Sequence, residues 1–208
     1  MKILVLGATG GTGQHVVSQA LQQGHEVTVL ARNPQRLTAQ SDRLHVTTGS
    51  VDDDQVLAGA VRGQDVVISA LGEGNSLKSS GLIARSMPAI VRAMESHGVR
   101  RLIYTSAYGV GETRRDAPLV PRIMMRLLLR DLYRDKAEGE EILRRSRLDW
   151  TLVYPVTLTT GPGTGRHRAG ERLALRGFPR ISRADLADFI LTQVADRTYV
   201  RKGVLVCS

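Results

Sequence analysis

The chain alternates between short apolar runs and longer segments in which apolar residues recur every third or fourth position. The short runs predict buried strands, because a strand covered on both faces carries apolar side chains at consecutive positions. The longer segments predict amphipathic helices. The pattern predicts strands at 3–6, 26–30, 43–47, 65–69, 101–105 and 150–154, an edge strand at 204–206, and helices after residue 13 and at 55–61, 83–96, 122–145 and 183–194.

This regular alternation is typical of an α/β protein with a doubly wound parallel sheet. The chain has 208 residues, of which 42% are hydrophobic, so it is long enough to bury a full core. No stretch has the composition of a linker between two domains. We therefore expect a single domain over residues 1–208, with its ligands beyond the carboxyl ends of the strands.

The first strand ends in a glycine-rich turn, Gly7-Ala8-Thr9-Gly10-Gly11-Thr12-Gly13. Gly7 permits a tight exit from the strand, Gly10 lets the backbone approach a pyrophosphate, and Gly13 lets the next helix pack closely against the sheet. The free N–H groups and the positive end of that helix then face the anion. The turn predicts a Rossmann-like dinucleotide site formed by Gly7, Thr9, Gly10, Gly11, Thr12 and Gly13.

The second strand ends beside two arginines, Arg32 and Arg36, where an NAD-specific protein usually has Asp or Glu. A carboxylate at this point accepts the ribose 2′-hydroxyl, whereas an arginine suits a 2′-phosphate. Guanidinium groups bind phosphate oxygens through charge-assisted hydrogen bonds. We therefore predict NADP(H) as the cofactor. The alternative is that both arginines are solvated loop residues.

Other strand ends supply small or polar residues that would meet at the same edge of the sheet. The residues after the third strand would flank the adenine, and those after the fourth would run beside the ribose and pyrophosphate. The fifth and sixth strands would reach the nicotinamide, and a plain strand-ending turn is the alternative in each case. The further cofactor-binding candidates are Ser50, Val51, Ala70, Leu71, Gly72, Thr105, Tyr154 and Pro155.

The composition argues against a membrane span, a disulfide and a metal site. No apolar run reaches the roughly 18 residues of a membrane span, and Met1 leads directly into a strand, so we expect a cytoplasmic protein without a membrane partner. The single cysteine, Cys207, excludes an internal disulfide, and the five histidines show no metal-ligand spacing. We expect no metal.

The formal net charge of +9 raises the question of nucleic-acid binding. Four of the arginines in the stretch 114–134 recur every fourth residue, but acidic residues are interleaved from 131 onward and no aromatic residues accompany the arginines as a single-strand binder requires. We expect an anionic small substrate or a solvated helix face instead, and no nucleic acid. The arginines are Arg114, Arg115, Arg122, Arg126, Arg130 and Arg134.

Several segments together resemble the atypical, single-domain branch of the short-chain dehydrogenase/reductase superfamily. These are Gly7-Ala8-Thr9-Gly10 with Arg32, Thr105-Ser106-Ala107, Lys136 before Glu140-Glu141, Asp149-Trp150-Thr151-Leu152 and Ile181-Ser182-Arg183-Ala184-Asp185. The resemblance covers nearly the whole chain and implies NAD(P)H binding. Within the branch, the size and the Thr105-Ser106-Ala107 segment look most like biliverdin-IXβ reductase/flavin reductase, which implies NADPH-dependent reduction of flavins and linear tetrapyrroles.

The catalytic candidates are Ser106, Lys136 and Tyr108. In the larger superfamily a tyrosine precedes the lysine by four residues and donates a proton to a carbonyl. Here Leu132 holds that position and Tyr133 stands three residues before Lys136, which favours a packing role for Tyr133. A flavin or quinone needs mainly orientation, because solvent can supply the proton.

Ser106 would hydrogen-bond a carbonyl of the acceptor, and Tyr108 would form a wall of its pocket. The glycine-rich loop 159–168 would close over the acceptor, with Arg166 and Arg168 favouring an anion. A disordered surface loop is the alternative reading of this segment.

Two function classes therefore remain open. The first is an NADPH-dependent reductase of a small electron acceptor such as a flavin, quinone or tetrapyrrole. The second is a non-enzymatic NADP(H)-binding redox sensor or regulatory protein, which the missing tyrosine four residues before Lys136 keeps open. An isomerase or epimerase with a retained cofactor is a third possibility. We expect a monomer or a small homo-oligomer.

Overall fold

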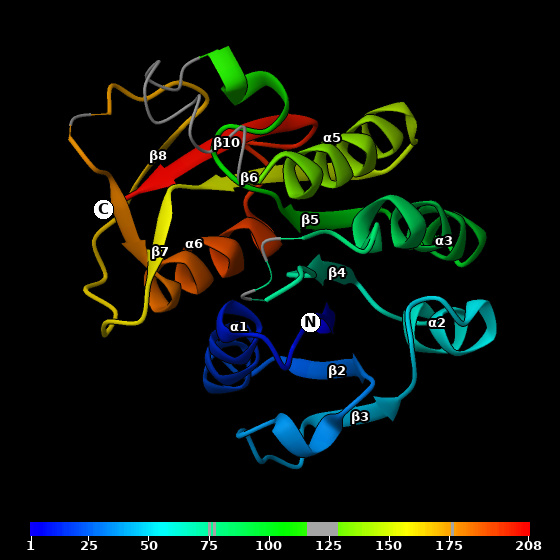
Figure 1. The fold of residues 1–208 in the computed structure, drawn as a ribbon. Helices are drawn as coiled ribbons and strands as arrows, with labels where there is room; N and C mark the ends of the chain where they lie inside the picture. The colour runs from blue at the N-terminus through cyan, green and yellow to red at the C-terminus, as the bar shows by residue number, and fades with distance from the viewer. Residues whose placement is uncertain (75, 77, 116–128, 176) are drawn as a thin grey trace.

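The computed structural model describes residues 1–74, 76, 78–115, 129–175 and 177–208. An eight-stranded sheet with the order β3-β2-β1-β4-β5-β6-β10-β8 forms its centre (Figure 1). Neighbouring strands are parallel except for the β10–β8 pair. The strands are β1 (Lys2–Leu6), β2 (Glu26–Ala31), β3 (Leu44–Thr48), β4 (Val66–Ser69), β5 (Arg101–Thr105), β6 (Asp149–Pro155), β8 (Arg168–Gly170) and β10 (Lys202–Cys207).

Helices cover both faces of this sheet, which confirms the predicted doubly wound α/β fold. Helices α1 and α6 pack together on one face, and α2, α3 and α5 lie on the other (Figure 1). A second, two-stranded sheet pairs β7 (Thr157–Thr159) with β9 (Arg180–Ser182). The helices are α1 (Gly11–Gln22), α2 (Asp54–Val61), α3 (Leu82–Ser96), α5 (Arg130–Arg145) and α6 (Arg183–Ala195), with short 3-10 turns η1 (Pro34–Arg36) and η2 (Gly111–Arg115).

The C-terminal strand differs from its prediction as an edge strand. Strand β10 lies between β6 and β8, and its residues 203–207 are buried. The edge on this side of the sheet is β8, a short antiparallel strand at the end of the glycine-rich loop, which the sequence did not indicate. The predicted helix at 122–145 is seen from Arg130 onward, and its residues 122–128 lie outside the described residues, as do Arg122 and Arg126.

The order of the strands creates the place for a ligand. The strand order reverses between β1 and β4: the chain proceeds from β1 outward to β2 and β3, and from β4 in the other direction to β5 and β6, so β1 and β4 are neighbours whose connections leave in opposite directions. Ligands of open α/β sheets bind at such a switch point, beyond the carboxyl ends of the strands. No helix among the described residues is long and apolar enough to cross a membrane.

Candidate cofactor and active site

A cavity of about 760 Å³ opens at the carboxyl ends of the central strands. Its glycine end lies at the turns after β1, β2, β3 and β4, and its lysine end is formed by the turns after β5 and β6 together with α3 and α5. Most of the predicted site residues meet here, although they come from seven separate segments. Those that line the cavity are Gly7, Thr9, Gly10, Gly11, Thr12, Arg32, Arg36, Ser50, Val51, Ala70, Leu71, Gly72, Thr105, Ser106, Lys136 and Pro155.

Three predicted residues are placed elsewhere. Gly13 is buried under the turn, where it acts through packing. Tyr154 lies behind the cavity wall, because its ring is fully buried and its hydroxyl donates to Glu140. Tyr108 is not among the described lining residues, and Tyr133, whose hydroxyl donates to the Tyr108 carbonyl at 3.3 Å, occupies the wall instead.

The glycine turn brings three stretches of backbone unusually close. Gly7 has a φ of +80°, and a Cβ at this position would lie 2.5 Å from the carbonyl oxygen of Ala70 after β4. A Cβ on Gly13 would lie 2.1 Å from the carbonyl oxygen of Gly7. Only glycine fits both contacts, so the start of α1 can lie directly over the end of β1. The unpaired N–H groups of its first turn therefore border the cavity.

The residues at this edge fit a dinucleotide. Helix α1 has no acidic residue in its first turn and no side-chain cap, so its positive end is available to an anion. At the lysine end, the buried Thr105 Oγ1 has no hydrogen-bond partner among the described residues. A buried polar atom without a partner is costly, so a ligand group that paired with Thr105 Oγ1 would be stabilised there.

The outer part of the glycine end is strongly basic. Arg32 and Arg36 are exposed beside the end of β2. Arg85, from α3, reaches the opposite side, where it forms an ion pair with Asp52 at 3.7 Å. Sequence reasoning missed Arg85, because it belongs to a helix whose exposed face reads as ordinary surface. Three guanidinium groups therefore border this part of the cavity.

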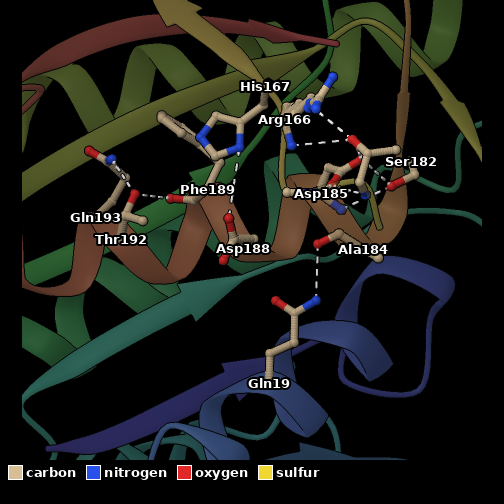
Figure 2. Close-up of polar contacts among 12 residues, drawn as sticks. Gln19, Arg166, His167, Ser182, Ala184, Asp185, Asp188, Phe189, Thr192 and Gln193 are labelled. Carbon is tan, nitrogen blue, oxygen red and sulfur yellow. Dashed lines mark hydrogen bonds and ion pairs between the residues drawn. The ribbon is translucent and has the colours of Figure 1, made fainter. Parts of the chain in front are cut away.

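A second missed residue, Arg183, comes from the start of α6. A Cβ added to Gly11 would lie 2.7 Å from Arg183 Nε, so the arginine side chain crosses the glycine turn. The two helices are fixed at this point, since Gln19 of α1 donates to the carbonyl oxygen of Ala184 at 3.0 Å (Figure 2). The sequence predicts that Ser182 caps the last helix, and the structure confirms this. That cap was the signal that could have placed Arg183 at the start of α6.

The loop that was expected to close over an acceptor is instead attached to α6. The Asp185 carboxylate accepts hydrogen bonds from the backbone N–H groups of Thr164 and Gly165 at 2.7 and 2.9 Å, and from Ser182 Oγ at 2.8 Å (Figure 2). His167 packs edge-on against Phe189 of the same helix. Through these contacts the loop packs against α6, and none of its residues lines the described cavity.

Neither loop arginine is placed at the described cavity. Arg168 begins strand β8, and its guanidinium donates to Cys207. Arg166 is exposed and is not among the lining residues. The basic groups at the cavity come from the glycine end and from α3, α5 and α6 instead.

The lysine end combines apolar walls with a few polar groups. Tyr133 and Lys136 both line this end. Lys136 Nζ donates to the Thr105 carbonyl oxygen at 3.3 Å and lies 5.6 Å from the centre of the Tyr104 ring. The apolar lining residues are Leu82, Ala107, Leu129, Leu132, Val156 and Leu158.

Helix α5 is held against this site by close packing. A Cβ on Gly139 would lie 2.5 Å from Ile83 Cγ2 of α3, so glycine lets the two helices approach. The buried Asp135 carboxylate accepts the N–H groups of Ile83 and Ala84 at 3.1 and 2.8 Å, and it thereby binds the first turn of α3. These contacts direct Lys136 and Glu140, one turn apart, toward the sheet.

The protonation of these groups is altered by burial. Burial lowers the pKa of Lys136 to about 8, although the nearby carboxylates of Glu140 and Asp135 oppose the shift. Burial raises the pKa of Glu140 and that of Tyr133. Groups with shifted pKa values that meet in a cleft are typical of functional sites.

A sequence profile of the NAD(P)H-binding family matches residues 7–197, a span that includes the whole cavity. The chain belongs to this family. A relative of this NAD(P)H-binding protein is (4-alkanoyl-5-oxo-2,5-dihydrofuran-3-yl)methyl phosphate reductase from Streptomyces griseus, 29% identical over 199 residues. The match covers 94% of the chain and 63% of that relative, so the chain spans less than two thirds of its length.

Solved structures share the fold. A short-chain dehydrogenase/reductase from Veillonella parvula has a TM-score of 0.84 at 22% identity, with 99% of this chain and 93% of that chain covered. ChuY, an anaerobillin reductase from Escherichia coli O157:H7, has a TM-score of 0.81 at 22% identity, with 99% and 96% covered. Reductases are therefore among the proteins that this NAD(P)H-binding chain resembles.

Proposed function

We propose that this protein is an NADPH-dependent reductase of a planar, electrophilic acceptor such as a flavin, a quinone or a linear tetrapyrrole. The observation that carries the proposal is the continuity of the cavity. It runs from exposed arginines suited to a 2′-phosphate, past a turn suited to a pyrophosphate, to an apolar chamber that contains a serine and a lysine. A bound dinucleotide and a flat acceptor would occupy its two ends.

The glycine end would bind and orient the cofactor. Arg32 and Arg36 would hold the 2′-phosphate, and the N–H groups of the first turn of α1, with Arg183 above them, would hold the pyrophosphate. Thr105 Oγ1, which lacks a partner among the described residues, would bind the nicotinamide portion. When bound, NADPH supplies the hydride for reduction.

The lysine end would bind and polarise the acceptor. Leucine and valine side chains exclude water and favour a flat, apolar ring system. Ser106 would hydrogen-bond an acceptor carbonyl, and the Lys136 ammonium group would stabilise the negative charge that develops there. The positive charge of Lys136 also favours acceptors that carry a carboxylate or a phosphate.

One observation favours a second candidate, a non-enzymatic NADP(H)-binding regulator. Leu132 stands where reductases of the larger superfamily carry their proton-donating tyrosine. One relative, the photosystem II assembly factor Ycf39 from Synechocystis, is 26% identical over 159 residues, which cover 74% of this chain and 44% of that protein. That relative is an assembly factor, so a role in assembly is also present among the relatives.

Turnover separates the two candidates. Purified protein is offered NADPH with FMN, FAD, menadione or biliverdin in turn, and the loss of reduced-nicotinamide absorbance is followed beside NADH controls. We expect saturable oxidation with at least one acceptor and faster turnover with NADPH than with NADH. Tight NADPH binding, measured by quenching of nicotinamide fluorescence, without oxidation by any of these acceptors would contradict the reductase and support the regulator.

A further inference from the structure

A buried carboxyl group lies directly behind the lysine end of the cavity. Glu140 is only 2% exposed. Its Oε1 accepts a hydrogen bond from Ser106 Oγ, and its Oε2 accepts one from the Tyr154 hydroxyl at 2.8 Å. The backbone of η2 covers the other side, since a Cβ on Gly111 would lie 2.1 Å from Oε2. Ser106 therefore stands between Glu140 and the cavity.

The groups around Glu140 determine its pKa. Burial raises its pKa, while hydrogen bonds from Ser106 and Tyr154 and the charges of Arg144 and Lys136 lower it, and the net effect is a raised pKa. Burial holds the pKa of Tyr104 and that of Tyr154 far above the ordinary value, so both phenols stay protonated. The titratable groups that interact electrostatically with Glu140 are Tyr104, Lys136, Arg144 and Tyr154. Asp135 acts on Tyr104 and Lys136.

The protonation state of Glu140 sets what Ser106 presents to the cavity. A serine hydroxyl has one hydrogen and rotates to suit its partners. When Glu140 is ionised, Ser106 donates that hydrogen to the carboxylate and offers the cavity only a lone pair. When Glu140 is protonated, the carboxylic acid donates to Ser106 Oγ, and the Ser106 hydrogen is free to point into the cavity.

We propose that Glu140 is the proton source of the lysine end and that it acts through Ser106. The proposal rests on the proposed reductase function. An acceptor that takes up a hydride gains two electrons and one proton, and it needs a second proton to keep its original charge. Ser106 gives its hydroxyl proton to the acceptor oxygen or nitrogen, and Glu140 passes its proton to Ser106 Oγ. Glu140 is left as a carboxylate, which takes a proton back through Ser106 from water after the product leaves.

The first test measures the protonation of Glu140 directly and does not require turnover. The carboxylic-acid C=O stretching band is followed by infrared spectroscopy during a pH titration of the full-length protein. We expect a band that persists above the ordinary carboxylate pKa and is absent from Glu140→Gln. Ser106→Ala and Tyr154→Phe each remove a hydrogen bond to the ionised form, so each shifts the midpoint to higher pH. The neighbouring Glu141, which is exposed and paired with Arg145, supplies the control Glu141→Gln, which retains the wild-type midpoint.

The second test follows turnover against pH with the best acceptor. Wild-type turnover falls as pH rises through the pKa of Glu140, because the proton source is lost, and falls again near pH 8, where Lys136 loses its charge. Glu140→Gln lacks the first fall and turns over roughly 100-fold more slowly at low pH. Its second fall moves to lower pH, because the Glu140 charge raises the pKa of Lys136 in the wild type.

The two tests also separate this inference from the proposed function. Absence of turnover in the wild type overturns the reductase. Normal turnover with an unchanged pH profile in Glu140→Gln overturns only the proton route. A Glu140 band that titrates at the ordinary value, or that Ser106→Ala does not move, also overturns it. If Glu140 acts through Ser106, the double variant Ser106→Ala/Glu140→Gln is no slower than the slower single variant.

Discussion

The glycine end of the cavity is formed mainly by backbone, whereas the lysine end is formed mainly by side chains. At the glycine end, Gly7, Gly13 and Ala70 bring three stretches of main chain within contact distance. At the lysine end, Ser106 comes from the turn after β5, Lys136 and Glu140 come from α5, and the three are joined by hydrogen bonds and charge. A backbone site is sensitive to the volume of a side chain, while a side-chain site is sensitive to protonation.

This difference predicts which properties a substitution at each end should change. Substitutions at the glycine end should change binding and stability without introducing a new pH dependence. Substitutions at the lysine end should change rates and their pH profile while cofactor affinity is maintained. A change that crosses this division would show that the two ends do not act separately.

The largest expected effect is that of Gly13→Ala. The new Cβ would meet the Gly7 carbonyl oxygen at 2.1 Å, and because the contact is to backbone, the start of α1 must move. We expect a loss of stability of about 1 to 3 kcal/mol, the usual range for overpacking, and a decrease in NADPH affinity of roughly 100-fold. Thermal unfolding and fluorescence titration measure the two effects.

Gly59→Ala is the matched control for Gly13→Ala. Gly59 also lies in a helix, and nothing lies within 4 Å of a Cβ added there. Replacing glycine by alanine in a helix interior should stabilise the protein by about 0.5 to 1 kcal/mol. Unchanged NADPH affinity in Gly13→Ala would mean that the close approach at the turn is not needed for binding.

A smaller and more selective effect is expected for Arg32→Glu. The substitution removes a guanidinium group suited to a 2′-phosphate and introduces a carboxylate suited to a ribose 2′-hydroxyl. We expect the ratio of NADPH to NADH affinity to fall by roughly 10- to 100-fold, as for the loss of one charge-assisted hydrogen bond. Stability should remain the same, because Arg32 is exposed.

Arg62→Glu makes the same change of charge at an exposed residue that does not line the cavity. It should leave the ratio of the two affinities unchanged. Dissociation constants for both cofactors, measured for both variants at the same salt concentration, test the prediction. An equal fall of the ratio in both variants would attribute the preference to overall charge, and an unchanged ratio in Arg32→Glu would contradict the NADP(H) assignment.

The glycine end was predictable from sequence because its geometry is local. The strand, the turn and the start of α1 are consecutive in the chain, and glycine spacing records the close contacts directly. The positions after β2, β3 and β4 followed from the rule that ligands lie at the carboxyl ends of parallel strands. Arg85 and Arg183 did not follow, because each reaches the cavity from a helix start distant in sequence.

The lysine end could be predicted only in part. Ser106 and Lys136 were indicated, but Glu140 reads in sequence as one of several acidic residues on a charged helix. Its burial depends on the close packing of α5 against α3 and the sheet, which no local pattern records. In the same way, β10 reads as an edge strand, because its antiparallel neighbour β8 lies in a glycine- and arginine-rich loop.

The smallest expected effect lies beside the glycine end, at the attachment of loop 159–168 to α6. Burial alone would raise the pKa of Asp185, but hydrogen bonds from Ser182, Thr164 and Gly165 hold it below its ordinary value. A lowered pKa in the folded state means that the ionised group adds stability above the ordinary carboxylate pKa, and that this contribution is lost as the pH falls through the folded value. Asp185→Asn should therefore cost about 1 kcal/mol at neutral pH and progressively less in acid.

Thermal unfolding of Asp185→Asn from neutral to acid pH tests this, with Asp42→Asn, an exposed residue ahead of β3 and outside the loop attachment, as the control. The control should follow the wild-type stability curve. A second result is expected for Asp185→Asn, because no residue of the loop lines the described cavity. Its NADPH affinity and the pH profile of its turnover should equal those of the wild type. A change in either would show that the loop attachment positions Arg183 over the glycine turn, and that α6 belongs to the cofactor site as much as α1 does.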